Sequence, residues 1–185
     1  TGSPPLRIRG GHTLQGLDYT LPVASAQVKS ALLLAGLYAH GRTCITEPAH
    51  TRDHTERMLR AFGYPIEVEG ARRCVEGGGR LRATTISVPA DISSAAFFMV
   101  GAAIAANSEV TLAEVGMNPT RVGVITILRA MGADIKVQRE RMVGGEPIAD
   151  VIVRSSPLRG IRIPSDQVPL AIDEFPALFV AAACA

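Results

Sequence analysis

Three short polar segments stand directly before runs of sequence that are almost entirely apolar. These segments are Ser25-Ala26-Gln27, Ser93-Ser94 and Asp173-Glu174. The composition of each apolar run predicts a helix, so each polar segment would lie at a helix N-terminus. A helix N-terminus exposes free N–H groups and a positive partial charge, and it therefore binds anions, phosphate above all. The three segments are candidate anion sites.

Helix capping is the competing interpretation of the same residues, because serine and aspartate are favoured N-cap residues. We expect capping as the role of Ser93 and Ser94. At the first segment Gln27 favours a ligand, since a glutamine beside an otherwise apolar helix requires a polar partner. Lys29, one turn further along, is expected to extend its ammonium to the surface rather than to bind a ligand.

The elements that position these residues alternate between helix and strand. Helices are predicted over residues 25–40, 52–62, 93–106 and 121–131, with a further one opening near 173. Strands are predicted over residues 42–46, 66–68, 86–88, 110–112, 135–137, 151–153 and 161–163. The helix over 52–62 is amphipathic, with a predicted inner face of Met58, Leu59 and Phe62. Gly63 and Gly132 are predicted to end the two amphipathic helices.

The sequence repeats with a period of 69 residues. Thr51-Arg52 matches Thr120-Arg121, the segment 59–63 matches 128–132, and 66–68 matches 135–137, each pair 69 positions apart. Three matched segments in one register indicate an internal repeat of α/β units. The first helix of each unit is almost entirely apolar, whereas helices that cover a doubly wound sheet keep a polar outer face. We therefore expect these helices to be buried inside the sheets.

Four segments resemble the signatures of the enolpyruvylshikimate-phosphate synthases, a family of enolpyruvyl transferases. They are residues 22–36, 51–59, 88–95 and 172–176, and they occur in the family's order. The resemblance implies an α/β fold of two domains, each an inverted, barrel-like set of three βαβαββ units with buried helices. The family's second crossing between domains falls near residues 89–91. Residues 1–89 would then be the later part of one domain and residues 90–185 the early part of the second.

The resemblance also implies an activity. The family transfers the enolpyruvyl group of phosphoenolpyruvate to the 5-hydroxyl of shikimate-3-phosphate and releases phosphate, without metal or organic cofactor, in the biosynthesis of chorismate and the aromatic amino acids. Ser25 and the backbone N–H of Ala26 would hold the shikimate phosphate together with Arg52, whose guanidinium fork suits it. Gln27 would contact the shikimate ring and lie near phosphoenolpyruvate.

The acidic segment carries the implied catalytic group. Asp173 would orient or deprotonate the 5-hydroxyl, with helix capping as its alternative role. Glu174 is expected to be a structural neighbour. The segment from Asn118 to Arg121 is expected to form a cap and turn, and Arg121, the repeat equivalent of Arg52, receives no binding role.

The family's principal phosphoenolpyruvate ligands lie outside the matching segments. The sequence also begins without methionine and stops inside an apolar run over 175–185. We therefore expect a central fragment that keeps the shikimate-3-phosphate half-site and Asp173. Such a fragment is expected to be inactive without the remainder of the same polypeptide.

Composition limits the other classes of function. The 185 residues are 47% hydrophobic, which excludes a disordered chain, and the net charge of +2 argues against a nucleic-acid partner. No apolar run is long enough to cross a membrane. Three cysteines without CxxC spacing or a paired framework predict a reducing, cytoplasmic location. His50 and His54 lack the HExxH context of a zinc site, so no metal is expected.

Two other functions stay open. An enolpyruvyl transferase acting on a UDP-amino sugar (UDP-N-acetylglucosamine enolpyruvyl transferase) would share the fold and the aspartate. It usually carries a loop cysteine and a Pro-Thr-Asp run after the aspartate, whereas Phe175-Pro176 follows the acidic pair here. A non-catalytic binding module built from the same repeat is the second alternative. Calorimetry with shikimate-3-phosphate would discriminate between them.

Overall fold

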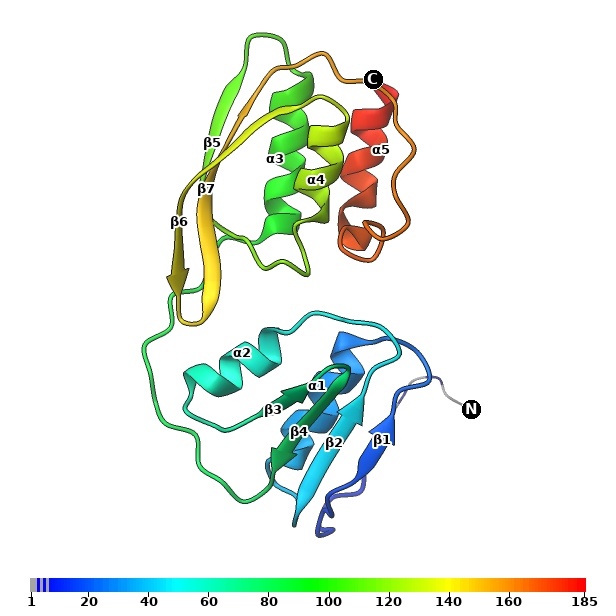
Figure 1. Ribbon diagram of the computed structural model, residues 1–185, viewed down its shortest axis with the longest axis vertical. Coiled ribbons are helices and arrows are strands. Elements are labelled where there is room, and N and C mark those ends of the chain that lie inside the picture. Colours follow the sequence, from blue (N-terminus) through cyan, green and yellow to red (C-terminus); the bar gives the residue numbers. More distant parts are fainter. Residues whose placement is uncertain (1–2, 4, 6) are drawn as a thin grey trace. The chain divides into compact units, whose positions relative to one another are not determined.

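The computed structural model describes residues 3, 5 and 7–185, and these divide into two compact units, Thr1–Ala83 and Thr84–Ala185 (Figure 1). Both units are mixed α/β, as predicted. The division after residue 83 lies close to the predicted boundary after residue 89. The assignment of the two units to the two domains of the family stays a prediction.

Unit 1 is a four-stranded sheet with two helices. Its elements are β1 (Asp18–Thr20), α1 (Ala26–Gly36), β2 (Arg42–Thr46), α2 (His54–Ala61), β3 (Glu67–Glu69) and β4 (Arg72–Glu76). The strand order is β1-β2-β4-β3, with β1 parallel to β2 and the other neighbours antiparallel. Helix α1 packs on β2 and β4. A small core lies around Leu33, Ile45, Leu59 and Val75, which are at most 3% exposed.

Unit 2 is a three-stranded antiparallel sheet with its helices on one side. Its elements are α3 (Ile92–Ile104), β5 (Glu109–Gly116), α4 (Gly123–Ala130), β6 (Asp134–Val143), β7 (Glu146–Arg154), the short 3-10 helix η1 (Ile172–Glu174) and α5 (Phe175–Ala183). The strand order is β5-β7-β6. Helix α3 contacts β5 and β7, α4 contacts β6, and α5 packs on α3 (Figure 1).

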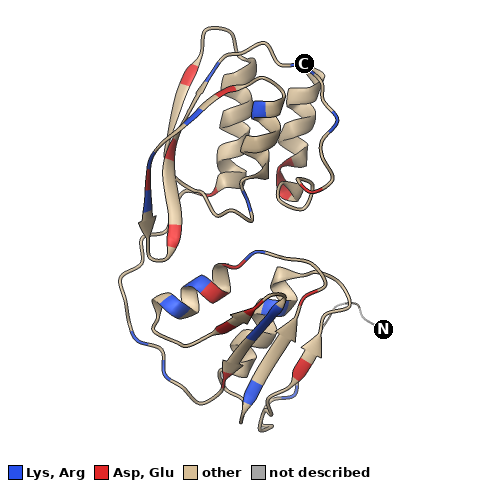
Figure 2. Ribbon diagram, in the orientation of Figure 1, with Lys and Arg blue, Asp and Glu red and all other residues tan. Residues whose placement is uncertain are grey.

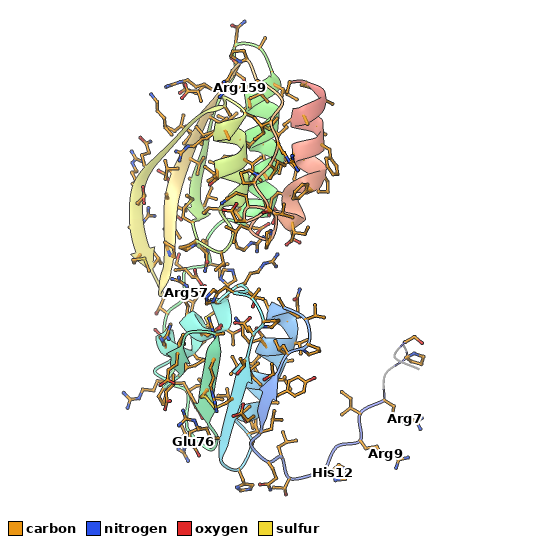
Figure 3. The ribbon with its side chains drawn as sticks, turned by 45° about the vertical axis from the view of Figure 1, so that its right-hand side comes forward. Arg7, Arg9, His12, Arg57, Glu76 and Arg159 are labelled. Carbon is orange, nitrogen blue, oxygen red and sulfur yellow. A yellow bond between two sulfur atoms is a disulfide. The ribbon has the colours of Figure 1, made fainter. Side chains whose placement is uncertain are left out.

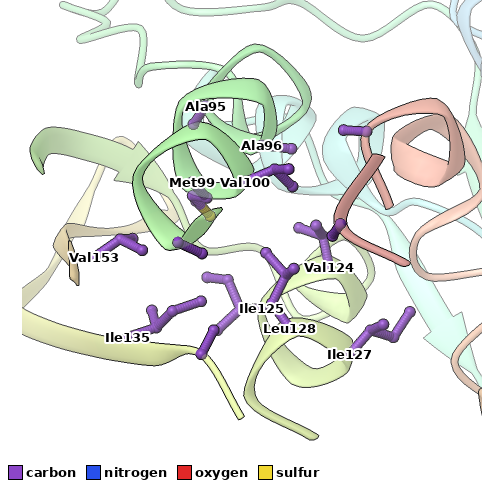
Figure 4. Close-up of a cluster of buried hydrophobic side chains, with 14 of the residues drawn as sticks. Ala95, Ala96, Met99, Val100, Val124, Ile125, Ile127, Leu128, Ile135 and Val153 are labelled. Atoms are coloured by element: carbon purple, nitrogen blue, oxygen red, sulfur yellow. The ribbon is translucent and has the colours of Figure 1, made fainter. Parts of the chain in front are cut away.

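The core of unit 2 is a larger cluster of buried apolar side chains than the core of unit 1. Figure 4 shows Met99 and Val100 of α3 facing Val124 and Leu128 of α4, with Ile135 and Val153 contributed by the sheet. Charged residues lie mainly on the strands and at the beginnings of the helices in this unit (Figure 2). Burial of these apolar side chains is the main stabilising term for unit 2.

The internal repeat of the sequence corresponds to a repeated order of helix and strand in the structure. Helices α2 and α4 follow the paired Thr-Arg segments, and β3 and β6 follow the helices. Gly63 and Gly132 have φ angles of 71° and 100° just beyond the two helices, a conformation that favours glycine and ends a helix. Leu59 and Leu128, which are equivalent positions, are 3% and 0% exposed.

The sequence predicts that the apolar helices of the repeat, here α1 and α3, are buried inside the sheets, and this prediction was only half right. Helix α3 buries Ala96 and Met99 completely, but Phe97 and Phe98, on its other face, are 61% and 63% exposed. Helix α1 likewise buries Leu33 and exposes its opposite face. Within the described residues each sheet covers only one side of its helix. These helices therefore carry more apolar residues than units 1 and 2 bury.

Two predicted strands are wrong, and two observed strands, β1 and β4, were missed. Residues 86–88 and 161–163 form no strand in the described chain; Ile161 and Ile163 instead pack as irregular segments against the core of unit 2. Strand β4 was not predicted because it begins with two arginines. The second of these, Arg73, is only 6% exposed and its charge is paired inside unit 1.

The prediction for the helix over 52–62 was partly wrong about its inner face. Leu59 is buried as expected, but Met58 is 43% exposed and Glu56 is only 1% exposed. The buried position of Glu56 is explained by cationic partners that the periodicity of apolar residues cannot reveal. Helix α2 therefore presents a carboxylate to the interior.

The expectation of unpaired cysteines was also wrong. Cys44 of β2 and Cys74 of β4 are opposite each other in the antiparallel ladder and form a disulfide. Their separation of 30 residues along the chain gave no signal, because pairing depends on the strand register. Cys184 is free and exposed. No helix in the part of the chain that the structure describes has the length and hydropathy to cross a membrane.

Candidate functional site

The first candidate site is the N-terminus of α1. Ser25 is the N-cap residue, with extended backbone (φ −149°, ψ 111°), and its Oγ accepts a hydrogen bond from Val28 N at 3.3 Å. The same Oγ donates to Gln27 Oε1 at 3.4 Å. The N–H groups of Ala26 and Gln27 belong to the first turn, whose N–H groups have no intrahelical acceptor. Ser25 therefore caps the helix and remains beside a set of N–H donors suited to an anion.

Gln27 is exposed, and Ser25 and Ala26 are partly buried, so this terminus is open to a ligand in unit 1. The stretch that carries Arg7, Arg9 and His12 extends away from the sheet of unit 1 (Figure 3). The candidate site residues of unit 1 lie at the start of α1 and in the loop that follows β2.

Arg52 lies in the loop between β2 and α2, and its backbone is held by α1. The Arg52 carbonyl oxygen accepts a hydrogen bond from Lys29 Nζ at 2.8 Å. A second link joins the two helices, because the hydroxyl oxygens of Ser30 and Thr55 are 2.6 Å apart. The structure thus connects the loop of Arg52 to the first turns of α1, although the two segments are more than twenty residues apart in sequence.

The prediction that Lys29 reaches the surface was wrong. Its side chain is 0% exposed, and Nζ lies 2.7 Å from Glu56 Oε1 and 3.3 Å from Glu47 Oε2. A buried ammonium is stable only where charge partners and hydrogen-bond acceptors replace water. The apolar residues beside Lys29 in the sequence give no sign of a charge partner. Its two carboxylate partners, Glu47 and Glu56, come from other elements of the fold.

Arg73 completes a four-charge cluster, which we call the buried ionic cluster: Lys29, Glu47, Glu56 and Arg73. Arg73 Nε lies 3.3 Å from Glu47 Oε2 and 3.4 Å from Glu56 Oε1. Its Nη1 donates to Gly70 O at 2.6 Å. The cluster holds two positive and two negative groups, so its formal charge is balanced.

The second candidate site lies in unit 2, at the starts of α3 and α5. The expected capping role of Ser93 and Ser94 was wrong: the N-cap residue of α3 is Asp91, whose Oδ2 accepts from Ser94 N at 2.8 Å and from Ser94 Oγ at 2.9 Å. Burial raises the pKa of Asp91, but hydrogen bonds from Ser94 and Ser93 and the charge of Arg121 outweigh it. The pKa therefore lies below its usual value.

Ser93 and Arg121 instead connect the two helix starts. Ser93 Oγ donates to Glu174 Oε1 and accepts from Arg121 Nη2. Arg121 Nη2 also lies 3.6 Å from Asp91 Oδ1, 3.5 Å from Glu174 Oε1 and 4.0 Å from Asp173 Oδ2. Arg121 received no binding role in the sequence analysis, although its equivalence to Arg52 in the repeat was a signal that it lies beside a helix N-terminus.

Asp173 and Glu174 have different environments. The Asp173 side chain is 47% exposed, whereas that of Glu174 is 2% exposed and paired with Arg121. The N-cap residues of η1 and α5 are Ala171 and Glu174, and neither side chain makes a cap hydrogen bond. Glu174 is buried beside Ser93 and Arg121, and its role as a structural neighbour stays a prediction. Asp173 is the more accessible carboxylate, beside an arginine, and could hold or accept the proton of a hydroxyl.

The segment leading to Arg121 forms the predicted turn. Asn118 Oδ1 accepts from Thr120 N at 2.9 Å and from Thr120 Oγ1 at 2.7 Å. Such an Asx turn fixes the backbone locally. Arg121 N in turn donates to Asn118 O at 2.8 Å. Within residues 3, 5 and 7–185 there is no group of three histidine, cysteine or acidic side chains placed to hold a metal ion.

Comparison with known proteins gives consistent matches. The family model for EPSP synthase (3-phosphoshikimate 1-carboxyvinyltransferase) matches residues 1–185. Curated proteins named 3-phosphoshikimate 1-carboxyvinyltransferase from Alkalilimnicola ehrlichii and Methylococcus capsulatus are 73% and 68% identical to this chain over 184 residues. Each match covers all of this chain but only 41% and 42% of the relative, so the chain spans less than half the length of these proteins.

Solved structures agree. EPSP synthase from Acinetobacter baumannii is 64% identical, with a TM-score of 0.89 over all of this chain and 42% of that one. The enolpyruvyl transferase NikO from Streptomyces tendae, at 19% identity and a TM-score of 0.62 over 83% of this chain and 36% of that one, shares the fold alone. With a family model that matches every residue, this chain belongs to the EPSP synthase family.

Proposed function

We propose that the chain carries the shikimate-3-phosphate half of an enolpyruvyl transferase that uses phosphoenolpyruvate as its second substrate. The observation that carries the proposal is the open N-terminus of α1, capped by Ser25, with the backbone of Arg52 tied to the same helix through Lys29. In this proposal two N–H donors, a hydroxyl and a guanidinium of unit 1 act together as a phosphate clamp. Family membership supports shikimate-3-phosphate as its ligand.

In this proposal the four residues of unit 1 bind and orient the substrate. Ser25 and the N–H of Ala26 hold the phosphate, and Arg52 neutralises its charge. Gln27, which is exposed at the same terminus, contacts the shikimate ring and the region where phosphoenolpyruvate binds. These groups fix the acceptor hydroxyl, and holding two reactants in place is a large part of the acceleration of a bimolecular reaction.

Asp173 is the proposed catalytic carboxylate of unit 2. It orients the 5-hydroxyl and accepts its proton as the hydroxyl oxygen adds to the enolpyruvyl carbon, while the methylene carbon gains a proton. Loss of phosphate and of a proton from the resulting methyl group then restores the double bond. The acid that protonates the methylene carbon and the phosphoenolpyruvate clamp belong, in this proposal, to the remainder of the same polypeptide. The 185-residue chain alone is therefore expected to be inactive.

We also place the protein in the cytoplasm, where phosphorylated biosynthetic intermediates are made and used. The Cys44–Cys74 disulfide is unusual for a reducing compartment. Both residues are buried, at 3% and 5% exposure, which shields the bond from soluble thiols. Alkylation of the protein under native and denaturing conditions, followed by mass measurement, would show whether the two thiols are bonded in cells.

The binding proposal predicts the effect of Arg52→Ala in a polypeptide extended to the length of the relatives. Loss of the guanidinium removes a charge-assisted contact to phosphate, so the Kd for shikimate-3-phosphate in calorimetry should rise about tenfold or more. Arg60→Ala is the matched control, because Arg60 lies exposed on α2. Shikimate, which lacks the phosphate, should bind weakly to all three proteins.

Each alternative function has its own result. Absence of heat and of a thermal shift with shikimate-3-phosphate at millimolar concentration would refute the proposed ligand. Binding of UDP-N-acetylglucosamine in its place would support the amino-sugar transferase. Tight binding of shikimate-3-phosphate without turnover of phosphoenolpyruvate, in the extended polypeptide, would indicate a non-catalytic module.

A further inference from the structure

The ammonium of Lys29 lies among oxygen atoms inside unit 1. It carries three hydrogens and has three oxygen neighbours: Glu56 Oε1 at 2.7 Å, Arg52 O at 2.8 Å and Glu47 Oε2 at 3.3 Å. The side chain is 0% exposed. Lys29 is therefore placed to hold other groups of the protein and not to touch a substrate.

One of these three neighbours differs from the other two. Glu47 and Glu56 balance charge, but the Arg52 carbonyl is the backbone of a proposed phosphate ligand. Lys29 itself is in the first turn of α1, where its N–H donates to Ser25 O at 3.0 Å. The Lys29 side chain thus spans from the helix turn that begins at Ser25 to the peptide of Arg52. It joins the two halves of the proposed phosphate clamp.

The loop of Arg52 has irregular backbone, so its position depends on such contacts. Thr51 Oγ1 donates to Glu47 Oε1, and Arg73 Nη2 lies 3.4 Å from His50 Nδ1. These contacts hold the loop before Arg52 to the buried ionic cluster. The Lys29 hydrogen bond fixes the residue that follows, at the point where the guanidinium side chain departs.

We propose that Lys29 is a positioning residue that sets the separation between the N-terminus of α1 and Arg52, and thereby the affinity for shikimate-3-phosphate. This inference rests on the proposed function. A site whose binding groups are already held in place loses less conformational freedom when the ligand binds, so a fixed separation of the two halves of the clamp raises affinity. A clamp assembled from a helix terminus and a loop needs a rigid link between them.

The test is Lys29→Met in a polypeptide extended to the length of the relatives. Methionine keeps much of the volume and removes the charge and the hydrogen bond to Arg52 O. The KM and calorimetric Kd for shikimate-3-phosphate should rise by about tenfold to a hundredfold. The KM for phosphoenolpyruvate, and kcat at saturating shikimate-3-phosphate, should stay near the values of the unsubstituted protein. A general loss of structure would change all of these together.

Two further variants separate positioning from stability. Lys29→Met/Glu56→Leu removes one positive and one negative charge and leaves the Glu47–Arg73 pair. It should recover Tm relative to Lys29→Met without recovering affinity for shikimate-3-phosphate. Leu33→Ala, at a position 0% exposed one turn further along α1, should lower Tm and keep the affinity.

The outcomes are distinct. If Lys29→Met binds shikimate-3-phosphate as tightly as the unsubstituted protein, or if the double variant recovers affinity together with Tm, the positioning role is refuted while the proposed function stands. If the unsubstituted protein itself does not bind shikimate-3-phosphate, the proposed function fails and the inference fails with it. A selective loss in both Lys29 variants, with Leu33→Ala unaffected, supports the inference.

Discussion

The two units use the same repeated helix for different interiors. Glu56 of α2 and Ile125 of α4 are equivalent positions 69 residues apart, and they are 1% and 3% exposed. Glu56 belongs to the buried ionic cluster, whereas Ile125 belongs to an apolar cluster. At this position of the repeat the interior is charged in unit 1 and apolar in unit 2. The flanking positions Leu59 and Leu128 remain apolar in both units.

This difference is related to the proposed roles of the two units. A buried ion pair contributes little net stability compared with apolar residues of similar volume, so the cluster of unit 1 is poorly explained by stability alone. Its contacts reach the loop of Arg52, which an apolar side chain could not hold by hydrogen bonds. In unit 2 the charged contacts lie instead at the helix starts, around Arg121.

The largest expected effect comes from placing the charge of unit 1 in unit 2. Ile125→Glu would bury a carboxylate among apolar side chains without a partner, which should destabilise unit 2 by about 3–5 kcal/mol or unfold it. Thr126→Glu is the control, because the neighbouring Thr126 is exposed.

The composition of the chain allows the two units to be followed separately in this experiment. All three tyrosines, Tyr19, Tyr38 and Tyr64, lie in unit 1, and the chain has no tryptophan. Tyrosine fluorescence therefore reports unit 1 during urea unfolding, while far-UV circular dichroism reports both units. An Ile125→Glu protein with unchanged transitions in both signals would contradict the apolar character assigned to this position.

The reciprocal change removes one partner from unit 1. Arg73→Met leaves two buried carboxylates with only Lys29, and an uncompensated buried charge should destabilise unit 1 by about 3–5 kcal/mol. Arg72→Met on the same strand is the control, since its ion pair with Asp18 is exposed and should contribute about 0–1 kcal/mol. Tyrosine fluorescence in urea measures both. Equal midpoints for the two variants would show that the buried ionic cluster contributes no more than a surface pair.

The sequence predicted the elements that depend on local patterns. Strand β2 was predicted with its observed bounds, and the helix ends at Gly63 and Gly132 followed from glycine at the right place. The missed strand β4 and the wrong inner face of α2 have one cause. Arg73 and Glu56 are charged, and a pattern of apolar residues assigns charged residues to the surface unless their partners are known.

The same limit applies to the site. Ser25, Ala26, Gln27 and Arg52 were singled out from helix-start chemistry and from the family resemblance, and the structure places them in one unit. The contacts of Lys29 and Arg121 could not be predicted, because each depends on side chains brought together from several elements. Pairing of Cys44 with Cys74 likewise depends on strand register.

The smallest expected effect concerns the caps of α1 and α3, which the two units also build differently. Asp91 caps α3 by accepting from Ser94 N at 2.8 Å and also accepts from Ser94 Oγ, whereas Ser25 caps α1 by accepting from Val28 N at 3.3 Å. Asp91→Ala should destabilise unit 2 by about 1 kcal/mol at neutral pH. Asp91→Asn keeps an acceptor for Ser94 N and should retain most of that stability.

The pH dependence sharpens this last comparison. The folded-state pKa of Asp91 lies below the ordinary value of 3.8, so the charged cap stabilises unit 2 above that value, and this contribution is lost as the pH falls through the lower folded-state pKa. The stability difference between the unsubstituted protein and Asp91→Asn should therefore shrink only in strongly acidic solution. Urea unfolding between neutral pH and pH values below 3.8, followed by far-UV circular dichroism, measures it.

Ser25→Ala should show no such pH dependence, because a hydroxyl cap carries no titrating charge. A difference that already disappears above pH 3.8 would mean that the Asp91 carboxylate is not held in its charged form by Ser94 and Arg121.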